Sequence, residues 1–355
     1  MIFTLARNVV SGAIGRHAFP GAVVETGTSR EVRWHEAMGQ VTYDDDAPAT
    51  TLDTIFDLAS LTKVVATTMA AMQLAEAGRL RLDDPVTRWL PEWRGEDRRL
   101  VTVEDLLSHA GGLPAWLPLF QVHQGRQAFV TEIARVPLEY APRSASVYSD
   151  LGFILLGFVL EQAAEESLDR QFATMSSRLG LGDITFRPPD AWKPRTAPTG
   201  FDPWRGRLLT GEVHDENAAA LGGVAGHAGL FGVASAVGKF ARWVLQARAG
   251  DRNACERLAP QGTLVQFTTH GHVPGSSRAL GWDTMLPTSS CGTRMSSLAF
   301  GHTGFTGTSL WIDPMRDLYA VLLTNRVYPS RTNEAIKQVR PAFHDAVVEE
   351  WPDRQ

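Results

Sequence analysis

The chain has 355 residues, of which 44% are hydrophobic and 21% charged, and its formal net charge is -5. This length and composition are typical of a globular protein with a large hydrophobic core. The weak negative charge, without dense lysine or arginine runs, gives no support for a nucleic-acid partner. The two cysteines, Cys255 and Cys291, are too few for a disulfide framework and are predicted to be free thiols.

The N-terminal 21 residues lack the basic start and the uninterrupted apolar core of a secretory signal. No later run approaches the ~18 apolar residues that a membrane span requires. We therefore expect a cytoplasmic protein with no membrane span, although a longer exported precursor cut back to Met1 would give the same sequence. The oligomeric state does not follow from these features, and a monomer is the favoured expectation.

The first part of the chain is predicted to form a helix followed by a hairpin. Apolar residues at helical spacing predict a helix over 2–16, which ends before Pro20 and Gly21. Two short apolar runs, 22–26 and 31–38, are joined through glycine and small polar residues and predict antiparallel strands.

The middle of the chain is predicted to be mostly helical. Apolar side chains at helical spacing, with Gly78 as a stop, predict one buried helix that begins near Ser60. Further helices are expected at 102–108, 129–135 and 151–166. The segment 185–211 is rich in proline, arginine and tryptophan, which favours an irregular excursion or a lid.

The C-terminal part is predicted to return to strands after a helix that begins near Ser235. Strands are expected at 279–284, 298–302, 309–312 and 318–324, and a closing helix at 332–349. Strands at both ends with helices between them predict an α/β (α+β) fold, in which both chain ends build one sheet beside a mostly helical middle region. We expect the sheet region to span 1–79 and 220–355 and the helical region 80–219, with the chemistry in the cleft between them.

Ser60 and Lys63 lie three residues apart at the start of a predicted helix, so their side chains share one helical face. A serine hydroxyl beside an amine is a nucleophile beside a base, provided that the amine is neutral part of the time. Burial and the positive helix N-terminus both favour the neutral amine. The structural alternative is that Ser60 only caps the helix. The pair gains weight because the chain has only four lysines.

Tyr148, Ser149 and Asp150 come directly before the long apolar helix at 151–166. One interpretation is structural: Ser149 or Asp150 caps that helix, and Tyr148 packs back as a hydrophobic staple. The functional interpretation is that the helix start aims the Tyr148 hydroxyl into the cleft. There a nearby Lys63 cation would favour the phenolate, which would relay a proton to the leaving group.

His302, Thr303, Gly304 and Phe305 lie at a late predicted strand, where a histidine is usually structural. Gly304, however, removes a side chain where a substrate backbone can approach. His302 and Thr303 supply hydrogen-bond donors for a carboxylate or a carbonyl. The Phe305 N–H would be a second oxyanion donor beside the first turn of the Ser60 helix.

Two other kinds of site are disfavoured. His214, Asp215, Glu216 and His227 have no second fixed spacing that supports metal ligation, so loop capping and cleft-wall hydrogen bonds are the favoured interpretation. The glycines between 221 and 232 never give the spacing of a dinucleotide-binding loop.

Ser60-x-x-Lys63, Tyr148-Ser-Asp150 and His302-Thr-Gly304 together resemble, in order and spacing, the three motifs of the serine β-lactamase and penicillin-binding-protein superfamily. The most similar branch contains class C β-lactamases, D-alanyl-D-alanine carboxypeptidases and related esterases. The resemblance covers nearly the whole chain, including the blocks VTVEDLLSHAGGLP and GGVAGHAGLFG. It implies a β-lactamase/transpeptidase-like fold with an antiparallel sheet, an acylated serine, proton shuttling by lysine and tyrosine, and no metal or organic cofactor.

Two residues depart from the family pattern. The second motif normally ends in asparagine, whose amide donates to the substrate carbonyl, whereas an ionised Asp150 only accepts. It would repel that carbonyl and hold Lys63 as a cation, so the sequence predicts that Asp150→Asn raises β-lactam turnover. The third motif often has lysine, and His302 instead predicts stronger recognition of an anionic substrate below about pH 6.5.

The leading hypothesis is a serine hydrolase that forms an acyl-enzyme on a β-lactam, a D-amino-acid peptide or a small ester. A small-molecule or peptide substrate is the expected partner. Ser60 attacks, Lys63 activates it and Tyr148 serves the leaving group. The expected substrate and oxyanion residues are Asp150, His302, Thr303, Gly304 and Phe305. The alternative is a non-catalytic, penicillin-binding-like binding or scaffold protein, suggested by Asp150 and by the missing export signal.

Overall fold

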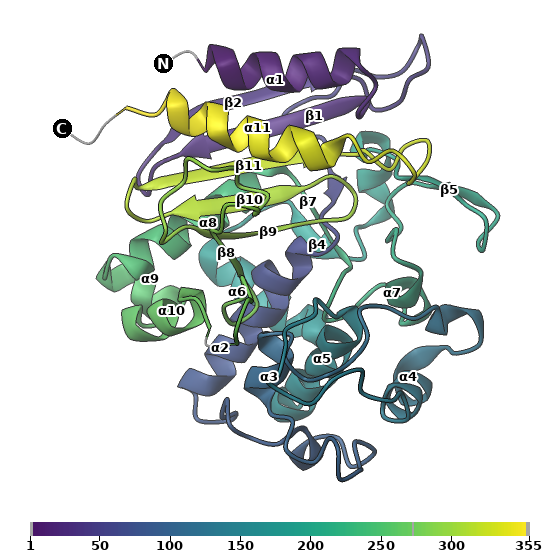
Figure 1. Cartoon of the computed structure of the whole chain (residues 1–355). Helices are drawn as coiled ribbons and strands as arrows, with labels where there is room; N and C mark the ends of the chain where they lie inside the picture. Colours follow the sequence, from purple (N-terminus) through teal and green to yellow (C-terminus); the bar gives the residue numbers. More distant parts are fainter. Residues whose placement is uncertain (1–2, 272, 353–355) are drawn as a thin grey trace.

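A six-stranded antiparallel sheet organises the computed structural model, which describes residues 3–271 and 273–352 (Figure 1). The strand order is β2-β1-β11-β10-β9-β8, so both ends of the chain build the sheet, as predicted. Its strands are β1 (Gly21–Gly27), β2 (Val32–Gly39), β8 (Asp283–Thr284), β9 (Phe300–Thr303), β10 (Ser309–Asp313) and β11 (Leu318–Thr324).

Helices cover both faces of this sheet. α1 (Thr4–Gly15) and α11 (Ile336–Glu349) lie side by side on one face (Figure 1). α8 (Ala234–Arg248) packs on the other face, against β1 and β11. Because side chains alternate along a strand, β11 supplies both layers: Leu322 packs in the cluster with α1 and α11, and Val321 in the cluster with α8.

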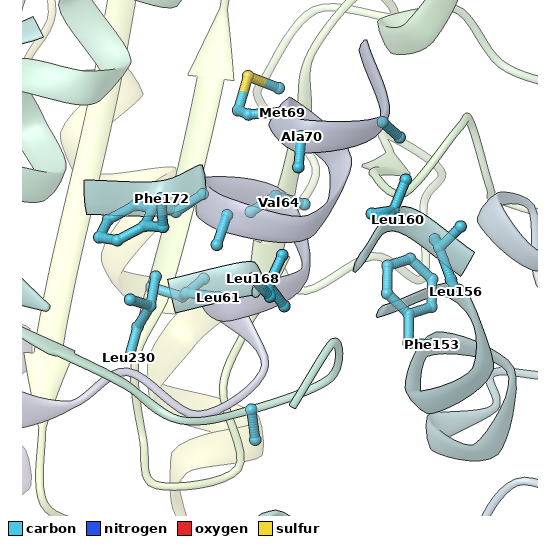
Figure 2. Close-up of a cluster of buried hydrophobic side chains, with 14 of the residues drawn as sticks. Leu61, Val64, Met69, Ala70, Phe153, Leu156, Leu160, Leu168, Phe172 and Leu230 are labelled. Carbon is cyan, nitrogen blue, oxygen red and sulfur yellow. The ribbon is translucent and has the colours of Figure 1, made fainter. Parts of the chain in front are cut away.

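The remaining helices lie beside the sheet, and several of them pack against the segment that follows Ser60. They are α2 (Thr68–Glu76), α3 (Val103–Leu107), α4 (Gly125–Ile133), α5 (Asp150–Ala164), α6 (Leu168–Leu179), α7 (Glu216–Ala220), α9 (Arg252–Arg257) and α10 (Gln261–Thr268). Figure 2 shows Leu61 and Val64 in a cluster with Phe153 of α5 and Phe172 of α6. The segment after Ser60 is therefore the buried centre of the helical side, which explains its apolar pattern.

Short elements differ most from the prediction. A three-stranded sheet of β3 (Phe56–Asp57), β7 (Leu230–Gly232) and β4 (Ile184–Phe186) was not predicted, nor was the pair β5 (Gly200–Asp202) and β6 (Arg207–Leu209). The segment 185–211 is thus less irregular than expected. Strands of two or three residues are too short to show an alternating pattern, so the sequence could not reveal them.

Two further predictions need correction. The strand expected at 279–284 is reduced to β8, because Gly281 has a positive φ of 85° and turns the chain. The middle region is less helical than predicted, and α9 and α10 lie where no helix was expected. Short 3₁₀ helices occur at Val86–Arg88, Leu119–Gln121 and Asp190–Arg195. The boundaries 1–79, 80–219 and 220–355 stay a prediction.

Two sequence-level expectations concern the molecule as a whole. Both Cys255 and Cys291 are free thiols, as predicted. Within residues 3–271 and 273–352, no helix has the length and apolar character needed to cross a membrane.

Candidate active site

The helix after Ser60 starts from a strained turn. Ala59 has a positive φ of 47°, which is unusual for a residue with a side chain. The buried carboxylate of Asp57 holds this turn, since it accepts the Ala59 N–H at 2.8 Å and the His214 N–H at 2.7 Å. Burial raises the pKa of Asp57 to about 6. The turn presents Ser60 at the wall of a cleft.

The first turns of this helix are not the regular α-helix that the sequence predicts. A π-helix over Lys63–Thr67 precedes α2, and the Thr68 N–H donates to the Lys63 carbonyl. Such wide turns are rare and are frequent at functional sites. Ser60 and Lys63 still share one face, because Lys63 Nζ lies 3.0 Å from Ser60 Oγ.

Tyr148 brings a third group to the same oxygen. Its hydroxyl donates to Ser60 Oγ at 2.7 Å, although the two residues are 88 positions apart in the sequence. Both interpretations of this segment hold in part, because Ser149 Oγ also caps α5 by accepting the Gly152 N–H at 3.1 Å. At the start of α5, Ser149 therefore stabilises the helix, whereas the phenol of Tyr148 faces the cleft.

Lys63 is fully buried, and three acceptors surround its amine. Nζ donates to Ser60 Oγ at 3.0 Å, to Asp150 Oδ1 at 2.6 Å and to the His227 carbonyl at 3.0 Å. Burial lowers the pKa of Lys63, but the negative charge of Asp150 and the phenol of Tyr148 raise it, and the net pKa is raised. Lys63 therefore rests as a cation, as expected from Asp150, rather than as a partly neutral amine.

Tyr148 rests as a neutral phenol. Burial and the charge of Asp150 raise the pKa of Tyr148 and outweigh Lys63, which lowers it. The phenolate that the sequence favoured is therefore not the resting form. A neutral hydroxyl in contact with Ser60 Oγ is placed to act first as a proton donor.

His109, which was not among the residues predicted for the site, packs against the ring of Tyr148. Its ring centroid lies 4.7 Å from that of Tyr148, and its Nδ1 accepts the Ser149 N–H at 3.0 Å. Burial and the charges of Arg278 and Lys63 lower the pKa of His109 well below its ordinary value, so the ring is neutral. Only the place of this histidine in the block VTVEDLLSHAGGLP could have indicated its position.

The end of β9 packs directly against the turn before the candidate nucleophile. A Cβ on Gly304 would lie 2.5 Å from the Leu58 carbonyl oxygen and closer still to Thr308 Oγ1. Thr308 Oγ1 donates to the Leu58 carbonyl at 3.0 Å, and Thr306 Oγ1 donates to the Asp57 carbonyl at 2.7 Å. Gly304 thus makes room for the chain's own turn, whereas the sequence suggested room for a substrate backbone.

Two backbone donors lie on the wall of the cleft. Within the described part of the chain, neither the Ser60 N–H nor the Phe305 N–H donates to a protein acceptor, and both residues line the cleft. A pair of preorganised N–H groups stabilises an oxyanion. The half-exposed ring of Phe305 packs against the Arg326 guanidinium, which lies 4.3 Å from the ring centroid.

His302 reaches the cleft but is not the cationic donor that the sequence predicts. Its Nδ1 lies 2.8 Å from the Thr303 carbonyl, which can only accept, so Nδ1 carries the proton and the Nε2 of the neutral ring is an acceptor. Burial and the charges of Arg278 and Lys63 lower the pKa of His302 well below its ordinary value. The ring centroid of His302 lies 5.8 Å from that of Tyr148.

Arg278 supplies the positive charge that His302 does not. Its guanidinium carbon lies 5.1 Å from the ring centroid of Tyr148, on the cleft wall. Its Nη1 is 4.0 Å from Asp283 Oδ1, at the outer limit of an ion pair, so the guanidinium retains donors for a ligand. No motif in the sequence marks this residue.

The cleft that joins these groups has a volume of about 700 Å³. It is lined by all the predicted site residues except Lys63, which lies beneath its surface. No residue of 185–211 lines the cleft, which favours the excursion over the lid. His227 Nε2 lies 2.8 Å from Asp215 Oδ1, and among the described residues no group of three or more His, Cys, Asp or Glu could hold a metal ion.

Comparison with known proteins agrees with this geometry. Residues 6–342 match the protein family described as Beta-lactamase. A relative from Escherichia coli (strain K12), named "Putative D-alanyl-D-alanine carboxypeptidase", is 34% identical over 321 residues, which cover 81% of this chain and 72% of the relative. The chain therefore belongs to the beta-lactamase family.

Solved structures agree in fold. "EstCE1, a hydrolase with promiscuous acyltransferase activity" has a TM-score of 0.75 at 23% identity and covers 97% of this chain and 98% of its own. A class C β-lactamase from Rhodobacter sphaeroides has a TM-score of 0.75 at 22% identity, and the match covers 98% of this chain and 99% of the β-lactamase chain. These similarities confirm the predicted α/β fold of the β-lactamase/transpeptidase type.

Proposed function

We propose that this member of the beta-lactamase family is a serine hydrolase that acts through an acyl-enzyme on Ser60. One observation carries the proposal: Ser60 Oγ lies 3.0 Å from Lys63 Nζ and 2.7 Å from Tyr148 Oη. A serine is a weak nucleophile unless neighbouring groups take and return its proton, and this site provides two such groups.

In the proposed reaction, the oxygen of Ser60 attacks a carbonyl carbon in the cleft, and the serine proton passes to Lys63. The N–H groups of Ser60 and Phe305 hold the oxyanion that forms. Tyr148, a neutral phenol, gives its proton to the leaving amine or alkoxide. Water then attacks the acyl carbon, and the same groups act in reverse to restore the serine hydroxyl.

The proposed substrate is an amide or ester that carries a carboxylate near the scissile bond, such as a D-amino-acid peptide or a β-lactam. Arg278 lies over the Tyr148 ring and would meet a negative group on the leaving-group side of the cleft. The name of the Escherichia coli relative favours the peptide. The hydrolase EstCE1 makes small esters the second class to test.

Covalent labelling tests the proposal. The protein is incubated with a fluorescent penicillin and, separately, with p-nitrophenyl acetate, and its intact mass is measured. We expect one added acyl group that is absent in Ser60→Ala. Ser11→Ala, on the exposed side of α1, is the matched control and should label like the wild type. Ser60-dependent release of D-alanine from a D-alanyl-D-alanine peptide would assign the carboxypeptidase class.

The non-catalytic binding or scaffold protein makes a different prediction. In that case the wild type forms no adduct and turns over none of these substrates, and Ser60→Ala binds the same ligands unchanged. That result would replace the hydrolase proposal.

A further inference from the structure

The amine of Lys63 has no free position for another proton. Nζ lies 3.0 Å from Ser60 Oγ, 2.6 Å from Asp150 Oδ1 and 3.0 Å from the His227 carbonyl oxygen. The three protons of the ammonium group are therefore all donated. The lysine therefore cannot take the proton of Ser60 until one of its own protons has left. Of its three acceptors, only the Asp150 carboxylate is a base.

We propose that Asp150 is the final proton acceptor of a relay that runs from Ser60 through Lys63 during acylation. This inference rests on the proposed function above and adds the group that stores the proton. In the family pattern the same position holds asparagine, whose amide takes no proton. The relay is thus a property of the aspartate in this chain.

The step conserves protons and charge. The O–H bond of Ser60 breaks as the bond from Oγ to the substrate carbon forms, and the proton goes to Lys63 Nζ. An N–H bond of Lys63 has broken beforehand and its proton is on Asp150 Oδ1, so a neutral amine and a neutral acid precede the attack. After the attack Lys63 is again a cation, Asp150 remains a neutral acid, and the negative charge is on the substrate oxygen.

Collapse of the intermediate resets the relay. Tyr148 protonates the leaving group, and the proton stored on Asp150 returns through Lys63, whose amine lies 4.7 Å from the centroid of the Tyr148 ring, to the Tyr148 oxygen. The net change in acylation is the transfer of one proton from Ser60 to the leaving group.

Burial makes this transfer accessible. The Lys63 side chain is 0% exposed and that of Asp150 is 18% exposed, and the ring centroids of Tyr148 and Phe153 lie 4.7 and 5.6 Å from Nζ. A buried ion pair carries a desolvation cost that the neutral pair avoids. A bound substrate expels further water, so the neutral pair is favoured most at the moment when Ser60 must lose its proton.

Neighbouring groups do not supply this function. The other titratable or charged groups around the pair are Tyr148, His109, His302, Arg278, Asp215 and His227. The tyrosine donates its proton to Ser60 Oγ, and the pKa values of the two histidines beside it are lowered well below neutral pH. The arginine stays charged. Asp215 is bound to the His227 ring, and only the carbonyl of His227 contacts the lysine amine.

The pH dependence of acylation distinguishes the relay from a lysine that titrates with solvent. The proteins compared are the wild type, Asp150→Asn and Asp190→Asn. The last is the matched control, because it removes an exposed lysine–aspartate pair, Asp190 with Lys193, outside the cleft. Each protein is mixed with p-nitrophenyl acetate, and the burst of p-nitrophenol is followed by stopped-flow absorbance. The wavelength is the one at which p-nitrophenol and p-nitrophenolate absorb equally, so the signal does not change with pH. Because p-nitrophenolate leaves without a proton, the burst rate reports activation of the serine.

The relay predicts two different profiles. The wild-type rate should be flat across neutral and mildly acidic pH, because the lysine passes its proton to Asp150 and not to solvent. In Asp150→Asn the lysine must lose its proton to solvent, so the acid limb should move up by at least about two pH units. At about pH 5.5 we expect the variant to be about 100-fold slower. Asp190→Asn should keep the wild-type profile.

Several results would overturn the relay. One is an acid limb at the same pH in Asp150→Asn, and another is a burst rate that rises at every pH in that variant. The repulsion predicted from sequence concerns a different quantity, the β-lactam turnover of Asp150→Asn. Tyr148→Phe is an independent check: the relay predicts a burst rate within about tenfold of the wild type, and an abolished burst would make Tyr148 the base. A wild type without any Ser60-dependent burst would instead refute the proposed function, and the relay with it.

Discussion

Replacement of Gly304 by alanine tests what holds the site together. The new Cβ would lie 2.5 Å from the Leu58 carbonyl oxygen, whereas ordinary contacts begin at 3.4 Å, so the strand end and the turn must separate by about 1 Å. The Thr308 hydroxyl, which donates to the same carbonyl at 3.0 Å, is also displaced. The substitution therefore changes the distance between Ser60 and Phe305, whose N–H groups form the proposed oxyanion site.

We expect Gly304→Ala to lower both stability and catalysis. Overpacking of this kind costs about 1–3 kcal/mol, measured as the free energy of unfolding in urea. A displacement of about 1 Å in a catalytic constellation lowers the rate by about 100-fold, measured as the burst rate with p-nitrophenyl acetate. Gly262→Ala in α10 is the control, because no atom lies within 4 Å of its new Cβ, and it should not lower either quantity.

The interpretation of Gly304 from sequence, room for a substrate backbone, predicts a different result. If the missing side chain only makes room for a substrate backbone, Gly304→Ala keeps the wild-type unfolding free energy and burst rate. It then raises only KM for a bulky peptide. This result would refute the packing argument.

Three further predictions follow from the cleft and its supports. Arg278→Gln should raise KM for a D-alanyl peptide about tenfold, and far less for the same peptide with an amidated C-terminus, because the guanidinium would meet the carboxylate. His109→Ala should lower the free energy of unfolding by about 1–3 kcal/mol, since it leaves the Ser149 N–H unpaired. His109→Asn should recover part of this loss, because asparagine offers an acceptor and tolerates the positive φ of 57° at position 109. For Asp215, burial raises the pKa, but His227 lowers it further, to about 2, below its ordinary value of 3.8. The carboxylate therefore stabilises the fold above about pH 4, and this contribution is lost as the pH falls through 2. Urea unfolding of Asp215→Asn should therefore show a loss of about 2 kcal/mol relative to the wild type at about pH 5 and almost none near pH 2.

Elements with a strong local signal could be predicted from the sequence. The apolar run of α5 and the strands β1, β2, β10 and β11 are long enough to show their periodicity, and the three motifs are short and local. The small sheet of β3, β7 and β4 could not be predicted, because each strand has only two or three residues and is defined by partners far along the chain. The π-helix at Lys63–Thr67 likewise has no known signature in the residues that form it.

Charge states in the site were harder to predict than positions. The sequence assigned His302 its ordinary pKa, but the value depends on burial and on Arg278 and Lys63, which come from other segments. The same holds for Tyr148, where Asp150 and burial outweigh the lysine. Residue type determines which proton can move, whereas the packing of distant segments determines where it rests.

Asp150 connects these observations. Burial alone would favour a neutral lysine amine at position 63, which suits an asparagine at position 150. With aspartate at 2.6 Å, the same buried amine is a cation, and the carboxylate that makes it one also raises the pKa of Tyr148. A cationic lysine and a neutral tyrosine leave the aspartate as the base in contact with the lysine amine. If Ser60 is acylated in this chain, the carboxylate that the sequence marked as a departure is the group in the site with the capacity to hold the serine proton.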